Sequence, residues 1–168
     1  MAIIKKLNGH TPKFGKNCFL ADNAAIIGDV EMGDDCSIWF GAVLRGDVHS
    51  IRIGNKVNIQ DNATIHATYK KSPTNIGNNV SIAHNAVIHG CTIKDNVLIG
   101  MGAIVLNGAK IGSDCIVGAG ALVTGKMDAP AGSMLLGSPA KVIRPLTEAE
   151  IEGVRQSARG YCQLAEEY

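Results

Sequence analysis

An aliphatic residue returns at every sixth position through most of this chain of 168 residues. A period of six fits neither the 3.6-residue turn of an α-helix nor the simple alternation of a strand. It is typical of a parallel β-helix, in which each hexad forms one short strand and three hexads form one coil. The repeat predicts a mainly β fold, with roughly five to six coils over residues 20–123. The repeated positions are Leu20, Ile26, Met32, Ile38, Leu44, then Ile53, Ile59, Ile65, then Ile76, Ile82, Ile88, and finally Ile93, Ile99, Val105, Ile111, Val117 and Val123.

Two insertions and a one-residue deletion interrupt the repeat. The insertions lie near Asp47–Ile51 and at Ala67–Asn75, and the deletion comes just before Ile93. A loop is least costly on the outside of a fold, where its backbone can reach water. Both insertions are therefore predicted to bulge from corners of the coil.

The segments on either side of the repeat have other patterns. Residues 1 to about 19 are expected to cap the first coil, and residues 124–145, which contain three prolines, are expected to be a connector. A helix is predicted over residues 146–168, because Thr147 as N-cap and Glu150 three residues later form a capping box. An apolar stripe along this helix predicts that it packs against the β-helix or a neighbouring chain.

Composition narrows the class of protein. The chain is expected to form a single domain over residues 1–168, and its net charge of +1 does not favour nucleic acid or an anionic membrane as a partner. Five cysteines, odd in number and without a CxxC pair, predict reduced and largely buried thiols. The first residues contain no long apolar run, so neither a signal peptide nor a spanning helix is expected. These features together favour a cytoplasmic location.

Two histidines occupy equivalent positions on consecutive coils. Ile65 and Ile88 lie three hexads apart, which is one coil, and His66 and His89 each follow one of them. Both histidines therefore point outward from the same face, one above the other, on strands ~4.8 Å apart. Two imidazoles so placed can share a metal ion whose bonds to nitrogen are ~2.0–2.1 Å long.

A third histidine, His84, belongs to the preceding face of the coil, because it comes two positions after Ile82. The segment between His84 and His89 spans up to ~15 Å, which one small metal site cannot bridge within one chain. A neighbouring chain could present its own His84 to this chain's His66 and His89. Such a head-to-tail contact between two different faces closes into a ring of three. The spacing predicts a homotrimer with a metal site between each pair of subunits.

The same counting places three further polar residues beside the histidines. Arg45 falls directly below His66, and Asp61 falls one coil below His84 with Gln60 beside it. In the predicted trimer, Arg45 and Asp61 would approach each other across the interface as an ion pair. That pair would be either a salt bridge alone or one with an additional catalytic role, and both interpretations stay open.

With these residues in view, the chain resembles the γ-class carbonic anhydrase and its close relatives among hexapeptide-repeat proteins. The resemblance covers nearly the whole chain, and its specific part is the set of three histidines with their Arg and Asp neighbours. The matching segments are Arg45-Gly46-Asp47, Asn58-Ile59-Gln60-Asp61-Asn62, His66, His84-Asn85-Ala86-Val87-Ile88-His89-Gly90-Cys91, and Gly137-Ser138-Pro139-Ala140-Lys141, the last of which hexapeptide acyltransferases share.

The resemblance implies a left-handed β-helix, a homotrimer and Zn²⁺, or alternatively Fe²⁺ or Co²⁺, at each subunit interface. It implies that His66 and His89 come from one chain and His84 from the next. The expected reaction is the reversible hydration of CO₂ to bicarbonate by a metal-bound hydroxide. Three neutral ligands leave the metal its full charge, which lowers the pKa of bound water to ~7.

The resemblance also assigns roles to residues around the metal. Arg45, Asp47 and Asp61 would hold the interface and order the site, and Gln60 would hydrogen-bond the hydroxide or the substrate. Tyr161 matches a residue that the C-terminal helix brings to the site in some relatives, although core packing is the favoured interpretation here.

One departure from the family pattern concerns the proton that must leave the site. The best-studied form uses glutamates for this step, one next to the Arg-Gly-Asp segment and others in an acidic insertion after the first histidine. Here Val48 follows Asp47, and the insertion after His66 contains Lys70 and Lys71 but no carboxylate. Water or His49 would have to carry the proton instead, and fast turnover is not expected.

Three alternatives remain. A hexapeptide acyltransferase using acetyl-CoA would share the fold and the trimer and use a histidine as general base without a metal. A catalytically weak, inactive or purely structural metal-binding relative would keep the ligands without the activity. A metal-dependent hydrolase, for instance of thioesters, is a smaller possibility.

Overall fold

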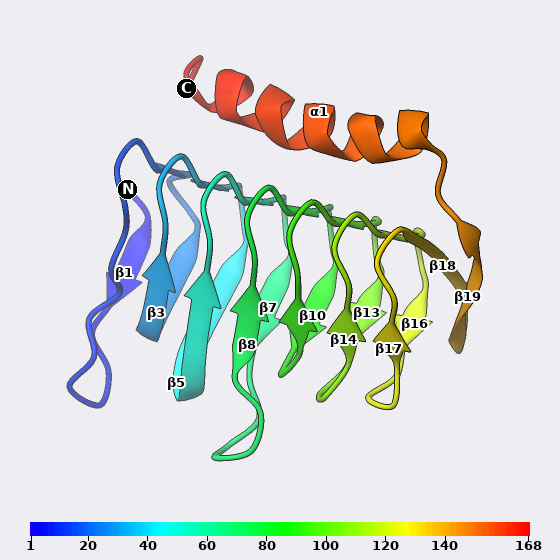
Figure 1. Ribbon diagram of the computed structural model, residues 1–168. Helices are drawn as coiled ribbons and strands as arrows, with labels where there is room; N and C mark the ends of the chain where they lie inside the picture. The colour runs from blue at the N-terminus through cyan, green and yellow to red at the C-terminus, as the bar shows by residue number, and fades with distance from the viewer.

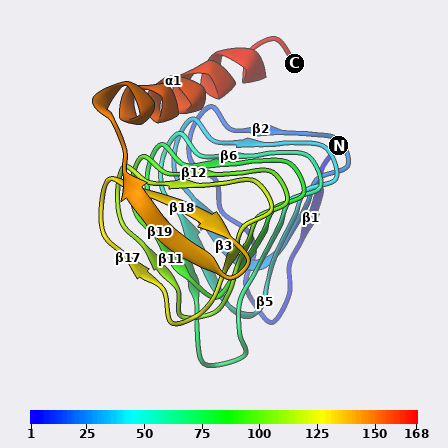
Figure 2. The ribbon, with the colours of Figure 1, turned by 90° about the vertical axis from the view of Figure 1, so that its right-hand side faces the viewer.

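A computed structural model describes residues 1–168 and confirms the parallel β-helix (Figure 1). Short strands stack in parallel on three faces around a triangular cross-section, which is seen along its axis in Figure 2. Face 1 consists of β1 (Ile3–Lys5), β3 (Ala25–Met32), β5 (Val43–Ile53), β7 (Thr64–His66), β10 (Val87–His89), β13 (Ile104–Val105) and β16 (Leu122–Val123). Face 2 consists of the later parts of β3 and β5 with β8 (Thr74–Ile76), β11 (Thr92–Ile93), β14 (Lys110–Ile111) and β17 (Asp128–Ala129). Face 3 consists of β2 (Phe19–Leu20), β4 (Ser37–Ile38), β6 (Asn58–Ile59), β9 (Ser81–Ile82), β12 (Leu98–Ile99), β15 (Ile116–Val117) and β18 (Ser133–Gly137).

The core is a set of inward-pointing aliphatic ladders that run along the axis. Ile59, Ile82 and Ile99 are aligned in register on face 3, and all three are completely buried. A small residue four positions after the aliphatic one is also buried, as Ala42, Ala63, Ala86 and Ala103 are. The core cluster contains 35 buried residues, and its apolar burial is the main stabilising contribution to the fold.

The two insertions lie at corners, as the sequence predicts. Most of the Ala67–Asn75 insertion, residues 67–73, leaves the coil between β7 and β8 as the loop at the bottom of Figure 1, and its last two residues begin β8. An antiparallel bridge between Thr68 and Ser72 closes the loop. The insertion near Asp47–Ile51 is accommodated differently, because β5 continues through it as one strand. Its extra residues appear as a shift of register where β5 pairs with β3.

The predicted connector over residues 124–145 is wrong. The structure continues the coil through β17, which pairs with β14, and through β18, which pairs with β15. The six-residue period runs on through Ala129 and Leu135, which are 3% and 0% exposed, but Ala129 is too small to stand out as an aliphatic repeat. The β-helix therefore has about seven coils, and β19 (Ala140–Pro145) folds back antiparallel on β18.

The C-terminal helix α1 (Glu148–Ala165) lies along face 3 and runs back toward the N-terminal end of the β-helix (Figures 1 and 2). The predicted capping box is confirmed, with the Thr147 side chain accepting from the Glu150 backbone N–H and Glu150 accepting from the backbone N–H of Thr147. Val154 and Ala158 are its buried contacts. The helix packs against β4, β6 and β9, whose outward residues Ser37, Asn58 and Ser81 are also buried.

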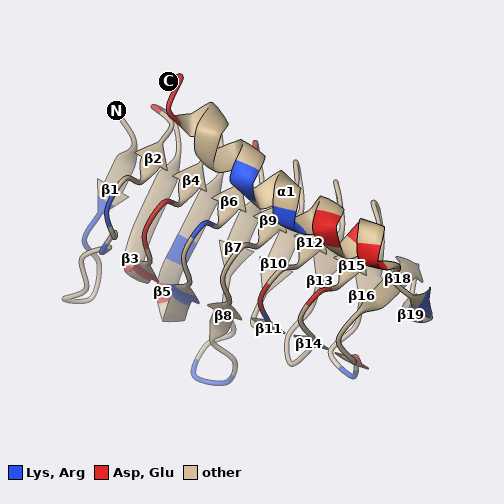
Figure 3. Cartoon of the chain, turned by 45° about the horizontal axis from the view of Figure 1, so that its top comes forward, with Lys and Arg blue, Asp and Glu red and all other residues tan.

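Charged residues of both signs are interspersed along the chain, and α1 carries acidic and basic bands in Figure 3. None of the structure's helices is both long and apolar enough to cross a membrane.

The ion pair at the start of α1 gives the fold a pH dependence. Arg144 hydrogen-bonds both carboxylate oxygens of Glu150, at 2.8 and 2.6 Å. This interaction, followed by the backbone N–H of Thr147, lowers the pKa of Glu150 from 4.5 to about 2. A carboxyl whose pKa is lowered on folding contributes stability above its unfolded pKa and loses it as the pH falls through the folded value.

We expect Glu150→Gln to lower the thermal unfolding midpoint at neutral pH. The difference from the unchanged protein should shrink as the pH falls from 4.5 toward 2, and circular dichroism melts across this range measure it. Glu148→Gln, in the same helical turn, is the matched control and should show a smaller difference. A Glu150→Gln difference that is constant with pH would contradict the prediction.

Candidate metal centre

His66 and His89 are stacked on face 1, as the hexad count predicts. They end β7 and β10, which are paired in register so that His66 lies directly opposite His89. Nδ1 of His66 and Nε2 of His89 are 3.1 Å apart. Both side chains belong to positions that alternate with fully buried isoleucines, which fixes the direction in which the two rings point.

The other nitrogen of each ring faces an oxygen. Nε2 of His66 lies 2.8 Å from Oδ1 of Asp47, and Nδ1 of His89 lies 2.7 Å from Oδ1 of Asn107. A neutral imidazole has one N–H, and here each ring uses it toward that oxygen. When both rings are neutral, the facing nitrogens carry lone pairs, and a proton or a metal cation between them would satisfy both. Two nitrogens bound to one ion at ~2.0–2.1 Å lie at most about 4.2 Å apart, so this pair fits.

Asp47 is held between His66 and Arg45. Its Oδ2 accepts from Nη1 of Arg45, while its Oδ1 accepts from His66. Burial alone would raise the pKa of the Asp47 carboxyl, but the hydrogen bonds from His66 and then from Arg45 outweigh it and lower the pKa. Asp47 is therefore ionised at neutral pH and orients the His66 ring.

Thr74 ties the two histidine strands together from inside. It is completely buried at the start of β8, and its Oγ1 donates to the carbonyl of His66. The same oxygen accepts from the backbone N–H of Gly90 at 2.9 Å, just after His89. One hydroxyl thus fixes the ends of both β7 and β10.

His84 lies apart from this pair, in the turn after β9. Its Nδ1 is 2.8 Å from Oδ2 of Asp61, and both side chains are more than a third exposed. Asp61 lies one coil below His84, where the hexad count puts it, since Ile59 pairs with Ile82. A single chain contains no group of three or more His, Cys, Asp or Glu side chains arranged to hold a metal ion.

Gln60 is buried beneath α1. Its Nε2 donates to Oδ1 of Asn58 at 2.9 Å, and the Asn58 amide in turn donates to Oγ of Ser81 at 2.8 Å. Ser81 lies 3.4 Å from Ser157 of α1, so a chain of polar contacts links Gln60 to the helix.

Tyr161 combines a packing contact with a polar neighbour. Its ring meets Trp39 edge-on with the centroids 5.5 Å apart, which agrees with the core-packing interpretation. Burial, and then the charge of Asp61, raise the pKa of the Tyr161 hydroxyl. The helix therefore brings Tyr161 near the carboxylate that contacts His84.

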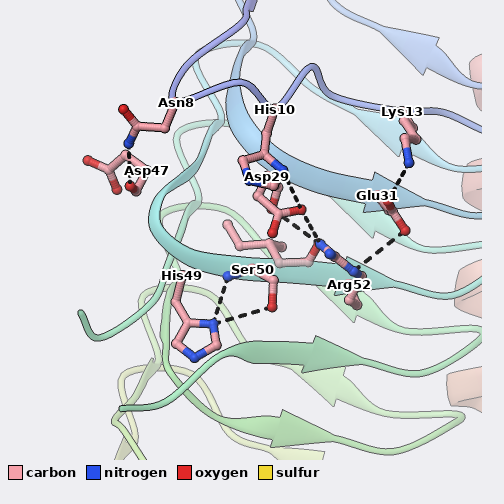
Figure 4. A network of polar contacts seen from close by, with 10 residues as sticks. Asn8, His10, Lys13, Asp29, Glu31, Asp47, His49, Ser50 and Arg52 are labelled. Atoms are coloured by element: carbon pink, nitrogen blue, oxygen red, sulfur yellow. Dashed lines mark hydrogen bonds and ion pairs between the residues drawn. The ribbon is translucent and has the colours of Figure 1, made fainter. Parts of the chain in front are cut away.

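His49, the candidate proton carrier, is held by its own strand (Figure 4). Its Nδ1 accepts from the backbone N–H of Ser50 at 2.8 Å. The same view shows Arg52 bridging Asp29, at 2.8 Å, and Glu31, at 3.5 Å. These contacts join β3 to β5, and none of them reaches the histidine pair within one chain.

Counting hexads in the sequence correctly predicted which outward residues stack on the face that contains His66 and His89. Ile27 pairs with Arg45, and Leu44 with Ile65, so Arg45 lies below His66 as expected. Asn107 and Thr74 were not among the sequence candidates. Asn107 could have been predicted, because it comes directly after Leu106, the outward residue one coil beyond His89. Thr74 could not, because its side chain points inward and the repeat gives no sign of a polar residue there.

Comparisons with known proteins agree with the fold and the motifs. The family model for "Bacterial transferase hexapeptide (six repeats)" matches residues 11–46 and 90–125. The chain is 45% identical to "Gamma carbonic anhydrase 2, mitochondrial" of Arabidopsis thaliana, over 93% of this chain and 58% of that protein. It is 40% identical to "Carbonic anhydrase" of Geobacillus kaustophilus, over 99% and 91% of the two chains. A crystal structure of a hexapeptide transferase family protein from Anaplasma phagocytophilum superposes with a TM-score of 0.95, at 39% identity, and covers 99% of this chain and 98% of that one.

The coiled architecture defines the class as the hexapeptide-repeat proteins. Within that class, the chain belongs to the γ-class carbonic anhydrase-like family. It spans 58% of the length of two Arabidopsis relatives and 62% of a third.

The double role of Thr74 gives a testable expectation. Thr74→Val keeps the shape but removes the hydroxyl that joins the backbone N–H of Gly90 to the carbonyl of His66, which then keep only their direct hydrogen bond of 3.2 Å. The loss of these two hydrogen bonds should lower the free energy of unfolding by about 0.5–1.5 kcal/mol. Urea denaturation measures the change. Thr64→Val, at a half-buried position of β7, is the control and should change stability by less than about 0.5 kcal/mol. Equal effects of the two substitutions would contradict this role for Thr74.

Proposed function

We propose that this protein catalyses the reversible hydration of CO₂ to bicarbonate with a divalent metal ion, Zn²⁺ or alternatively Fe²⁺ or Co²⁺. The observation that carries the proposal is the histidine pair, in which Nδ1 of His66 and Nε2 of His89 face each other at 3.1 Å while the other nitrogen of each ring contacts an oxygen. The relatives named carbonic anhydrase support the choice of reaction.

His66 and His89 would hold the ion from one chain, and His84 from the next. Neutral imidazole suits all three metals, so the ligand set alone does not select one. When bound, the ion supplies a Lewis acid that makes hydroxide available for attack on CO₂ near neutral pH.

The chain's own residues would order this site. Asp47 keeps the proton of His66 on Nε2, and Asn107 keeps the proton of His89 on Nδ1, which leaves Nδ1 of His66 and Nε2 of His89 free as ligands. Outer contacts of this kind orient metal-binding histidines and raise their affinity. Asp61 would do the same for His84, whose Nδ1 it contacts.

A homotrimer is part of the proposal. The His84 side chain contacts Asp61 within one chain, and it belongs to face 3, whereas the histidine pair lies on face 1. A second chain docking head-to-tail would bring its His84 to the pair, and Arg45 could then meet the Asp61 of that chain. Leu106 and Ile104, which are 36% and 37% exposed on face 1, supply apolar surface for such a contact.

Gln60 and Tyr161 have less direct roles in this proposal. The Gln60 amide is buried and engaged by Asn58, so it would reach substrate only after that contact breaks. Tyr161, on α1, lies near Asp61 and would help to hold the Asp61 carboxylate in place beside His84.

An acyltransferase is the second candidate, because similar solved structures include hexapeptide transferases. An acetyl-CoA enzyme of this fold needs a histidine base but no metal. The acyltransferase reaction would not explain why the His66 and His89 rings face each other while Asp47 and Asn107 contact their outer nitrogens. A metal-binding relative without activity, or one that hydrolyses another substrate, keeps the same ligands and differs only in turnover.

Stopped-flow CO₂ hydration on anaerobically purified protein, with metal content measured on the same sample, tests the proposal. We expect about one metal ion per chain, activity that rises with buffer concentration because the insertion after His66 contains no carboxylate to export the proton, and loss of metal and activity in His89→Ala. His10→Ala, which removes an exposed histidine, is the control and should leave both unchanged. Metal without CO₂ hydration would favour the inactive relative, and no metal after Zn²⁺ or Fe²⁺ is supplied would favour the acyltransferase.

Mixed trimers test the shared site. His84→Ala and His89→Ala should each be inactive alone, but a trimer that contains both kinds of chain has one interface where an intact pair meets an intact His84. Co-expression with two different tags and tandem purification should therefore recover up to a third of the activity. No recovery in verified mixed trimers would contradict the proposed division of ligands between chains.

A further inference from the structure

Two cysteines lie one above the other at the N-terminal end of face 3. Cys18 and Cys36 directly precede β2 and β4, whose register pairs Phe19 with Ser37. The backbone N–H of Phe19 donates to the carbonyl of Cys36 at 2.9 Å, which fixes the two strands side by side. Neighbouring strands are ~4.8 Å apart, inside the ~4.4–6.8 Å separation of Cα atoms that a disulfide bridges.

Packing alone does not require thiols at these positions. The equivalent position on the next three coils is valine, at Val57, Val80 and Val97, each completely or almost completely buried. Valine thus fills this corner well, and the two cysteines occur together only where the coil opens to solvent.

A cavity of about 500 Å³ opens at this corner, between the first coils and the C-terminal end of α1. Cys18, Cys36 and Cys162 all line it. Its other polar lining includes the carboxyl groups of Asp35 and Glu166. Cys18 is half-buried and so can be reached from this cavity, while Cys36 is 1% exposed behind it.

The two thiols have different acidities. A hydrogen bond with Cys36 is the largest cause that lowers the pKa of Cys18 to about 7, against the effects of burial and of Asp34 and Asp35. The same contact, and then burial, raise the pKa of Cys36. By contrast, burial raises the pKa of Cys91 to about 12. Cys18 is therefore the more acidic thiol of the pair and the one expected to react first.

We propose that Cys18 and Cys36 form a redox-active dithiol that reacts with small peroxides, at a site separate from the histidine pair. The Cys18 thiolate attacks one peroxide oxygen, the O–O bond breaks, and the leaving oxygen takes up a proton, so that Cys18 becomes a sulfenic acid. Sγ of Cys36 then attacks the Cys18 sulfur, the S–O bond breaks, and the departing hydroxide takes the Cys36 proton to form water. Two thiols are oxidised by two electrons, and hydrogen peroxide is reduced to two molecules of water.

The acidic lining of the cavity selects the oxidant. Asp35 and Glu166 would repel a negatively charged disulfide that acted as the oxidant. Hydrogen peroxide is small and neutral, so it can enter the cavity without this repulsion. Cys36 is the better placed partner because it precedes the strand that is paired with the strand after Cys18, whereas Cys162 lies on α1. Both proposed thiols now donate to backbone carbonyls, Cys18 to Gly33 at 3.3 Å and Cys36 to Gly54 at 3.2 Å, so each Sγ must turn away from its carbonyl to react. Burial, and then the charge of Asp35, also raise the pKa of Cys162.

Peptide mapping of the reduced full-length protein after treatment with hydrogen peroxide tests this site. We expect two of the five thiols to be lost, with Cys18 joined to Cys36, while Cys115, at the equivalent corner of a later coil, stays free. At neutral pH, iodoacetamide should alkylate Cys18 at least about tenfold faster than Cys115, because the thiolate is the reactive form.

Cys36→Val, which introduces the residue of the next three coils, isolates the first step. In this variant Cys18 should stop at a sulfenic acid that dimedone traps, and the pH midpoint of its alkylation should rise from about 7 toward 9. Cys162→Ala should leave the Cys18–Cys36 link intact. A disulfide that contains Cys162, or a Cys18 that reacts no faster than Cys115, would overturn the proposal. Should Cys36→Val fail to fold, the map of the unchanged protein decides alone.

Discussion

The in-register stacking of inward aliphatic side chains is the constraint on which the rest of this structure depends. Side chains alternate between the two sides of a strand, so a slip of one residue would turn every isoleucine outward. Ile65 and Ile88 are completely buried and directly opposed, which makes such a slip costly. His66 and His89 directly follow these isoleucines, so the same register places them opposite each other, with Nδ1 of His66 3.1 Å from Nε2 of His89. The geometry of the site is thus a consequence of core packing one residue away.

The same scaffold explains why the fold alone says little about chemistry. The core uses the inward positions of the coil, and chains similar to this one are named both carbonic anhydrase and hexapeptide transferase. The contacts that bear on chemistry are made by a small group of outward residues at one corner, in which Asp47 and Asn107 contact the outer nitrogens of the two rings. Function therefore has to be argued from these contacts, and the coil supplies only their spacing.

Much of this arrangement was predictable from the sequence, and the limits have physical causes. The six-residue period was enough for the faces, the stacking of His66 on His89 and the position of Arg45, because all of these follow from backbone register. The end of the β-helix was missed because Ala129 fills an inward position without the bulk that makes a repeat visible. Thr74 was missed because its role depends on side-chain direction at a corner, which no periodicity encodes.

Each half of the proposed metal centre is ordered within its own chain before any partner arrives. Asp47 holds His66 at 2.8 Å, and Asp61 holds His84 at the same distance, so both faces orient an imidazole with a carboxylate. Ordering these rings in advance removes part of the entropy that association would otherwise cost. In the proposed trimer, assembly would then need only to bring two prepared surfaces together, and the ion would add its binding energy to the contact between chains. Metal binding and trimer stability would on this basis be linked, each strengthening the other.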